Sequence, residues 1–408
     1  MARKILYVVA FVGLSLALLA YAVTRPGELV TPTGSGTITI DGQTFEAFPL
    51  PDYVTSIADG DYLSYLIEVE PGIKIHMLEI GRGFPLFLQH GNPTTGLLYP
   101  KVADALGNEQ FRILMPTLAG LGFSSKIPTH QHTVENHVRW INQALTQLEI
   151  NELIFVGQDW GGPIGIGALA ESPELLKGAV ILNTGLNAPR EARDLSRAHA
   201  LAKSPITGEI LLEVVVSVFS QMHQAQGDPS SLPPEVVALY EQPLETAGNK
   251  KAPLTMMRMV PDSPLHPSAE SMRKVESYTQ ALDIPVEIVW GMSDPILGKA
   301  LPLMQANFPD APVTETAAGH FLQEEVPQEI AEAIQRVYAR TLPDASMADS
   351  AGPQRSKCDV ILLEILNIYG LKAFALADPG GHYVLAPSNR GGEPNPFKVA
   401  VPLTYGPA

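Results

Sequence analysis

The sequence of 408 residues is poor in cysteine and in positive charge. Its single cysteine, Cys358, excludes an intramolecular disulfide and any cysteine-rich metal site. The chain carries 27 Lys and Arg against 43 Asp and Glu, which gives a formal net charge of −16 and a pI near 5.0. An acidic surface repels phosphate backbones, so nucleic acid is excluded as a partner bound through a basic face.

Long apolar runs are also scarce, and the one that stands out covers residues 5–23. A helix needs about 20 apolar residues to cross a bilayer. Arg3 and Lys4 precede this run, and Ala20-Tyr21-Ala22 resembles a signal-peptidase site. Residues 1–25 are therefore predicted to be a membrane anchor or a signal peptide.

Both readings export the rest of the chain, because positive charge stays inside. The expected location is thus membrane-anchored or exported, on the periplasmic or extracellular face, with membrane contact through the N-terminal segment. The alternative is a cytosolic enzyme with a buried N-terminal helix, which the lack of an amphipathic pattern disfavours.

The middle of the chain alternates between short apolar runs and helical stretches, which is typical of a parallel sheet covered on both faces. Residues 26–58, rich in Pro, Gly and Thr, are predicted to be a linker, within which residues 36–40 are a candidate short strand. Strong helical periodicity marks 133–148 and 327–340. The predicted strands are 62–70, 73–79, 85–89, 112–115, 153–158, 179–182, 286–290 and 312–316.

A largely helical insertion, residues 185–282, interrupts this alternation after one core strand and ends just before the next. It is predicted to be a cap over a core formed by 59–184 and 283–342. The apolar run Ile210–Phe219 within it either lines a substrate cavity or packs the cap onto the core. Residues 343–408 form a C-terminal extension whose sequence gives no motif.

The run Gly157-Gln158-Asp159-Trp160-Gly161 follows an apolar strand and opens a small-residue helix. This pattern predicts a strand–elbow–helix that presents a nucleophile on a strained turn, where larger neighbours would clash with it. With a carboxylate at the tip, the covalent intermediate is an alkyl ester of Asp159. Such attack suits displacement at saturated carbon, in carbon–halogen bonds or epoxides.

A nucleophile of this kind needs a base to complete the reaction, and the base needs an orienting acid. Asp294 follows the strand at 286–290, and His320 follows the strand at 312–316. The carboxyl ends of parallel strands meet at one edge of a sheet, where active sites gather. Asp159, Asp294 and His320 are therefore predicted to be nucleophile, acid and base.

The loop His90-Gly91-Asn92-Pro93-Thr94 follows the strand at 85–89. Backbone N–H groups of Asn92 and Trp160 are predicted to flank the carboxylate of Asp159 and form an oxyanion hole.

These motifs resemble the haloalkane dehalogenase family of the α/β-hydrolase fold over roughly residues 60–342. The resemblance implies an α/β protein with a mostly parallel eight-stranded sheet, helices on both faces and an inserted helical cap. It also implies that the side chains of Asn92 and Trp160 donate N–H groups to the leaving halide. The expected substrate is a small halogenated hydrocarbon, converted to alcohol, halide and proton without metal or cofactor. The matching residues are 90–94, 158–162, 319–321, Pro116, Gly120, Leu121, Gly122 and Ser124.

The chain departs from the family pattern at Thr117, where relatives usually carry Asp. Some relatives place the acid after the preceding core strand, but Leu182-Asn183-Thr184 holds no carboxylate, so Asp294 takes the role. An epoxide hydrolase is the main alternative, with Tyr240 or Tyr278 as its acid. A non-catalytic hydrolase-fold binding protein is the other, which the intact triad disfavours.

Overall fold

The computed structural model describes residues 2–107, 109–342, 373–377 and 383–387. The chain divides into two compact units, Met1–Leu342 and Pro343–Ala408. Within the second unit, β11 (Ala373–Ala377) pairs with β12 (Tyr383–Pro387) as an antiparallel hairpin. The rest of the predicted C-terminal extension lies outside the described residues.

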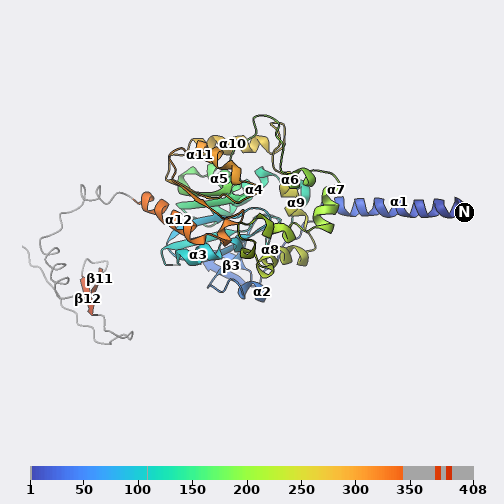
Figure 1. The fold of residues 1–408 in the computed structure, drawn as a ribbon. Coiled ribbons are helices and arrows are strands. Elements are labelled where there is room, and N and C mark those ends of the chain that lie inside the picture. Colours follow the sequence, from blue (N-terminus) through green and yellow to red (C-terminus); the bar gives the residue numbers. More distant parts are fainter. Residues whose placement is uncertain (1, 108, 343–372, 378–382, 388–408) are drawn as a thin grey trace, which may run out of the picture. The chain divides into compact units, whose positions relative to one another are not determined.

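Figure 1 shows the fold of the first unit. It is built on one ten-stranded sheet with the order β1-β2-β3-β4-β6-β5-β7-β8-β9-β10. In that order, the strands from β1 to β6 pair antiparallel, including β4 with β6. The strands from β6 to β10 pair in parallel. The strands are β1 (Thr37–Ile40), β2 (Gln43–Ala47), β3 (Leu63–Glu70), β4 (Ile73–Gly81), β5 (Phe84–Gln89), β6 (Phe111–Pro116), β7 (Leu153–Asp159), β8 (Leu176–Thr184), β9 (Val286–Gly291) and β10 (Val313–Thr316).

The sheet has two strands more than predicted, because part of the predicted linker 26–58 joins it. β1 and β2 form a hairpin, and β2 pairs with β3. The turn residues Asp41 and Gly42 both have positive φ, at 50° and 87°. An Asp-Gly pair favours this two-residue hairpin turn, so the sequence carried a signal for the extra strands.

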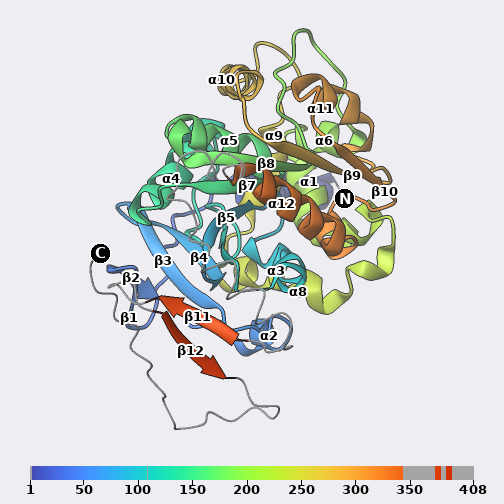
Figure 2. The same cartoon turned by 90° about the vertical axis from the view of Figure 1, so that its left-hand side faces the viewer.

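Helices cover both faces of the parallel strands (Figure 2). On one side α4 (Val134–Gln147) packs on α5 (Gly161–Ala170), and on the other α3 (Pro100–Leu106) packs on α12 (Pro327–Thr341). Thr133 caps α4 by accepting a hydrogen bond from the Asn136 backbone N–H at 3.1 Å. Short helices α2 (Asp52–Thr55) and α11 (Leu301–Asn307) complete the body.

The insertion between β8 and β9 is helical, as the sequence predicts. Its last helix, α10 (Ala269–Gln280), packs on α5 of the body. The apolar run at 210–219 includes a π-helical turn, η4 (Ile210–Val215), and does not line the cavity described below. The other helices are α6 (Arg197–Ala202), α7 (Thr207–Glu209), α8 (Pro234–Thr246), α9 (Lys251–Arg258) and the 3-10 segment η5 (Phe219–Ala225).

The location predicted from the N-terminal segment is wrong. Residues 2–24 form one helix, α1 (Ala2–Thr24). Crossing the hydrocarbon core takes a helix that is both long and apolar enough. No helix among the described residues is long and apolar enough to cross a membrane. The expectation of a membrane-anchored or exported protein, with membrane contact through residues 1–25, is corrected accordingly.

Candidate active site

Asp159 lies at the end of β7, on the turn that leads into α5. Its φ is +49°, a left-handed conformation that non-glycine residues rarely adopt. A side chain on Gly91 would clash with the Asp159 carboxylate, and one on Gly161 would clash with the backbone carbonyl of Gln89. The hydroxyl of Thr184, at the end of β8, donates to the Asp159 carbonyl at 2.5 Å. The glycines and this bond hold the strained turn in place.

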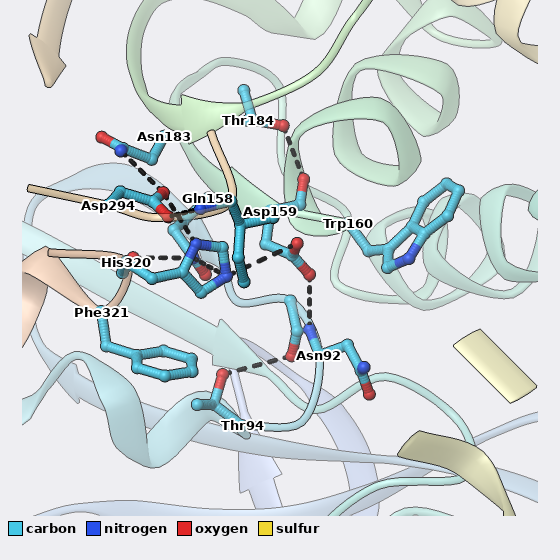
Figure 3. Close-up of polar contacts among 12 residues, drawn as sticks. Asn92, Thr94, Gln158, Asp159, Trp160, Asn183, Thr184, Asp294, His320 and Phe321 are labelled. Carbon is cyan, nitrogen blue, oxygen red and sulfur yellow. Dashed lines mark hydrogen bonds and ion pairs between the residues drawn. The ribbon is translucent and has the colours of Figure 1, made fainter. Parts of the chain in front are cut away.

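The structure brings the three residues of the predicted triad together (Figure 3). The Nε2 of His320 lies 3.6 Å from Oδ2 of Asp159, and its Nδ1 lies 2.9 Å from Oδ2 of Asp294. His320 and Asp294 are buried, with 1% and 5% of their surfaces exposed. The imidazole therefore bridges two carboxylates in a site that excludes most water.

The two carboxylates decide the protonation of His320. Burial alone would lower the pKa of this histidine, but the charge and hydrogen bond of Asp294 and the charge of Asp159 raise it to about 8. Burial acts to raise the pKa of Asp294. The net pKa is nevertheless lowered, because the charge and hydrogen bond of His320 and the hydrogen bond of Asn183 stabilise the carboxylate more strongly. An ionised Asp294 thus faces an imidazole that it stabilises as a cation.

Asn183 supports the acid, a role that the sequence did not reveal. Its Nδ2 donates to Oδ2 of Asp294 at 2.9 Å, while its Oδ1 accepts from the Gly291 backbone N–H at 2.7 Å. The Ile296 N–H donates to the other oxygen of Asp294 at 2.7 Å. Asn183, near the end of β8, therefore orients the carboxylate of Asp294 in the turn after β9.

The loop after β5 supplies one of the two predicted backbone donors. The Asn92 N–H donates to Oδ1 of Asp159 at 2.7 Å. Within the described residues, the Trp160 N–H makes no hydrogen bond to this carboxylate. One oxygen of Asp159 is thus held by an amide, and the other faces His320.

The side-chain donors of Asn92 and Trp160 point toward the cap helix α9. Asn92 Nδ2 donates to the Pro253 carbonyl at 3.1 Å, and Trp160 Nε1 donates to the Met256 carbonyl at 3.0 Å. Both groups that the resemblance assigns to halide are therefore occupied by backbone oxygens of a single helix. No sequence pattern at α9 indicates this contact.

Two glutamines that sequence reasoning missed hold the histidine loop. Gln158 Nε2 donates to the His320 carbonyl at 3.0 Å and lies 3.3 Å from the His320 Nε2. Gln226, next to η5, accepts from the Phe321 N–H at 2.9 Å. The Ala225 carbonyl also accepts from the His320 N–H at 2.7 Å. Residues of the helical insertion therefore hold the loop of His320 in place.

A cavity of about 250 Å³ opens beside the nucleophile. Asp159 and Trp160 form one side, and Met272, Leu297 and Leu303 contribute apolar surface. Arg193 and His199, from the segment before and within α6, add polar groups. The sequence carries no motif that indicates a place for His199 in this cavity.

The alternative acids of the cap do not reach this cavity. Tyr240 is fully buried, and its hydroxyl donates to Glu324 at 3.2 Å. Neither Tyr240 nor Tyr278 lines the cavity. In the described part of the chain, no group of three His, Cys, Asp or Glu side chains is arranged to hold a metal ion.

Comparisons with known proteins agree with this architecture. A family model described as the alpha/beta hydrolase fold matches residues 85–214. Haloalkane dehalogenase 2 of Mycobacterium tuberculosis is 28% identical over 265 residues, which covers 64% of this chain and 90% of that protein. A cis-3-alkyl-4-alkyloxetan-2-one decarboxylase of Shewanella oneidensis is 28% identical over 290 residues, which covers 69% of this chain and 90% of that protein.

Solved structures give the same result. The haloalkane dehalogenase DatA of Agrobacterium tumefaciens C58 superposes with a TM-score of 0.62 at 25% identity, covering 70% of this chain and 99% of DatA. The epoxide hydrolase CorEH superposes with a TM-score of 0.57 at 20% identity, covering 68% and 99%. The resemblance seen in the motifs is thus confirmed, and the chain is an α/β-hydrolase-fold protein related to the haloalkane dehalogenases.

Proposed function

We propose that the chain is a hydrolase that removes halide from small haloalkanes through an alkyl ester on Asp159. One observation carries the proposal. A carboxylate on a strained elbow has one oxygen held by the Asn92 amide at 2.7 Å and the other 3.6 Å from His320. A carboxylate at this position forms an ester with an alkyl carbon, and the adjacent histidine serves to hydrolyse it.

In the first step an oxygen of Asp159 attacks the halogen-bearing carbon. A carbon–oxygen bond forms as the carbon–halogen bond breaks, and the electron pair leaves with the halide. Asn92 Nδ2 and Trp160 Nε1 donate to the halide once they release the α9 carbonyls. Both groups are suited to an anion, since the indole N–H is a pure donor and the amide offers two N–H groups.

In the second step His320 takes a proton from water, which attacks the ester carbonyl carbon. Asn92 N–H stabilises the oxyanion that forms. The intermediate then collapses with cleavage of the bond between the carbonyl carbon and the alkoxide oxygen. The alcohol leaves with the proton held by His320, and the Asp159 carboxyl releases the remaining proton to water. Ester formation removes the negative charge of Asp159, one of the causes that raise the pKa of His320. The pKa of the imidazole therefore falls in the intermediate, and the ring becomes a neutral base when it is needed.

Two measurements test the proposal together. Purified protein incubated with 1-bromobutane is expected to release bromide and 1-butanol in equal amounts. A single turnover in heavy-oxygen water is expected to place the label in Asp159, because water attacks the ester carbon. Label found in the alcohol alone would exclude the covalent route, and the absence of bromide would exclude the haloalkane substrate.

Opening of a strained oxygen ring is the second candidate. It is favoured by the occupation of Asn92 and Trp160 by α9 carbonyls, and by the polar groups of Arg193 and His199 in the cavity lining. The epoxide hydrolase and the oxetan-2-one decarboxylase among the similar proteins agree with such a leaving group. Parallel assays would separate the products: a diol from a terminal epoxide, and carbon dioxide from an oxetan-2-one.

A further inference from the structure

The cap places a histidine in the cavity of Asp159 that has no part in the triad. His199 belongs to α6, and it lines the cavity together with Asp159 and Trp160. The tyrosines expected for leaving-group chemistry are absent from that lining. Among the described residues, Ser196 is the side chain that contacts the His199 ring by hydrogen bond.

Ser196 fixes the His199 ring. Its Oγ lies 2.8 Å from Nδ1 of His199 and accepts from the His199 backbone N–H at 3.3 Å. The Oγ–Nδ1 contact fits either tautomer of the ring. With the hydroxyl as donor, the proton of a neutral imidazole lies on Nε2. Nε2 forms no hydrogen bond with any residue that the structure describes, so in this tautomer it can donate to a ligand.

The charge state of His199 fits a donor that keeps its proton. Burial lowers the pKa of this histidine; the charge of Asp159 opposes the shift, and those of His320, Lys203 and Arg193 reinforce it. These groups are the titratable neighbours that act on the ring, and Asp159 and His320 among them belong to the reacting site. A neutral imidazole N–H can stabilise developing negative charge by a hydrogen bond without losing the proton.

We propose that His199 donates from Nε2 to the leaving group that Asp159 displaces. This role rests on the proposed function, because it concerns the same first step. As the new ester bond forms and the old bond breaks, the electron pair goes to a halide or a ring oxygen. His199 holds that anion by a hydrogen bond; a halide then departs as such, and an alkoxide takes its proton from water. The cap residue thereby sets which leaving groups react well.

The test isolates the first step in a His320→Phe background, where ester hydrolysis is blocked. Intact-protein mass spectrometry measures the rate of alkyl addition for chloro-, bromo- and iodoalkanes of one chain length. His199→Ala is expected to slow the reaction of the chloroalkane by about 10- to 150-fold, the value of one hydrogen bond to a charged group. The iodoalkane is expected to lose less, because iodide needs less stabilisation.

Matched variants separate this role from packing. His199→Gln keeps an amide N–H near the position of Nε2 and is expected to restore much of the chloroalkane rate. Leu195→Ala removes apolar bulk from the same cavity and is expected to change all three rates by one common factor. If His199→Ala does not fold, Ser196→Ala is measured in its place. This variant removes the hydroxyl that holds the His199 proton on Nε2. Its alkylation rates are expected to fall less than those of His199→Ala, and again most for the chloroalkane and least for the iodoalkane.

The outcomes are distinct. A loss that is equal across the halogens, or no loss, overturns the donor role of His199 and leaves the function of Asp159 intact. If no alkyl group is added to Asp159 while His199 is present, for haloalkanes and for a terminal epoxide alike, the proposed function fails and the role of His199 fails with it.

Discussion

The body and the cap hold their polar residues in different ways. His320 and Asp294 of the body are buried, and each makes several hydrogen bonds to side chains and backbone from neighbouring strand ends. Arg193 and His199 of the cap lie on a short helix or just before it and are partly exposed to solvent. The proposed nucleophile and base therefore lie in well-supported positions of the body, whereas the proposed donor of the cap is held by fewer contacts.

Near Asp159 and His320, three backbone carbonyls of the cap accept hydrogen bonds from the body. Carbonyls of Pro253 and Met256 accept from Asn92 and Trp160, and the carbonyl of Ala225 accepts from the His320 N–H. A backbone carbonyl offers no charge, so an anion can replace it at a donor with a gain in hydrogen-bond strength. Occupied donors are therefore compatible with halide binding, provided that α9 shifts.

The largest expected effect is in the body. Asp159→Asn removes the nucleophile while keeping the size of the side chain. Loss of a covalent nucleophile costs about 10⁴-fold or more in turnover, so halide release should fall to the background rate. Thermal unfolding of the variant serves as the control. Residual activity within about tenfold of the wild type would contradict the assignment of Asp159 as the nucleophile.

His320→Phe should separate the two steps. Alkylation of Asp159 needs no base, whereas hydrolysis of the ester does. The variant is expected to take up one alkyl group per chain from a bromoalkane and to release bromide once. Intact-protein mass spectrometry and bromide determination measure both. Normal repeated turnover would contradict the assignment of the base.

The next largest effect is expected for the side-chain donors Asn92 and Trp160, which contact the cap helix α9. Asn92→Ala and Trp160→Leu each remove one N–H from the leaving group and are expected to slow carbon–halogen cleavage by about 10- to 150-fold. Chloroalkanes should lose more than iodoalkanes. Met257→Ala, on the same helix α9 but without a part in either contact, is the matched control. Unchanged rates in both variants would mean that the α9 carbonyls keep these donors throughout the reaction.

The pH dependence of ester hydrolysis should follow the charge state of His320. His320 must be neutral to accept a proton from water, so ester hydrolysis should rise with pH. The pKa of His320 is about 8 while Asp159 is charged, and it falls once the ester removes that charge. The hydrolysis rate should therefore level off below about pH 8, with a tenfold change per unit on the acid side of the midpoint. Rapid-quench measurement of ester decay checks this; a midpoint above 8 would contradict the loss of Asp159 charge as the cause.

Strand ends explain which parts of this architecture the sequence could predict. Each predicted strand from 62–70 to 312–316 corresponds to an observed strand, because apolar runs bounded by turn residues depend on local pattern. Asp159, Asp294 and His320 lie together because each follows such a strand. The eight-stranded count and the membrane location were wrong.

The features missed around Asp159 and His320 depend on contacts between distant segments. Asn183 reaches Asp294 over 111 positions, and Trp160 reaches Met256 over 96 positions. No periodicity or local motif encodes such a pair. His199 and Asp159 line the same cavity only because of how the cap folds, so the sequence did not show that they are neighbours. The roles of the site residues remain predictions that the experiments above address.

The smallest expected effects compare ion pairs of the two regions. In the body, the buried carboxylate of Glu287 forms ion pairs with Arg336 at 2.8 Å and with Arg340 at 2.9 Å. In the cap, Lys203 pairs with Asp262 at 2.6 Å, with 22% and 39% of the side chains exposed. Glu287→Gln should lower the free energy of unfolding by about 1 to 2 kcal/mol, because a buried carboxylate is lost while both guanidinium groups still reach water. Asp262→Asn should change it by less than about 1 kcal/mol, because water screens the pair. Urea unfolding of both variants measures the difference, and a larger loss for Asp262→Asn would mean that the cap is held as firmly as the body.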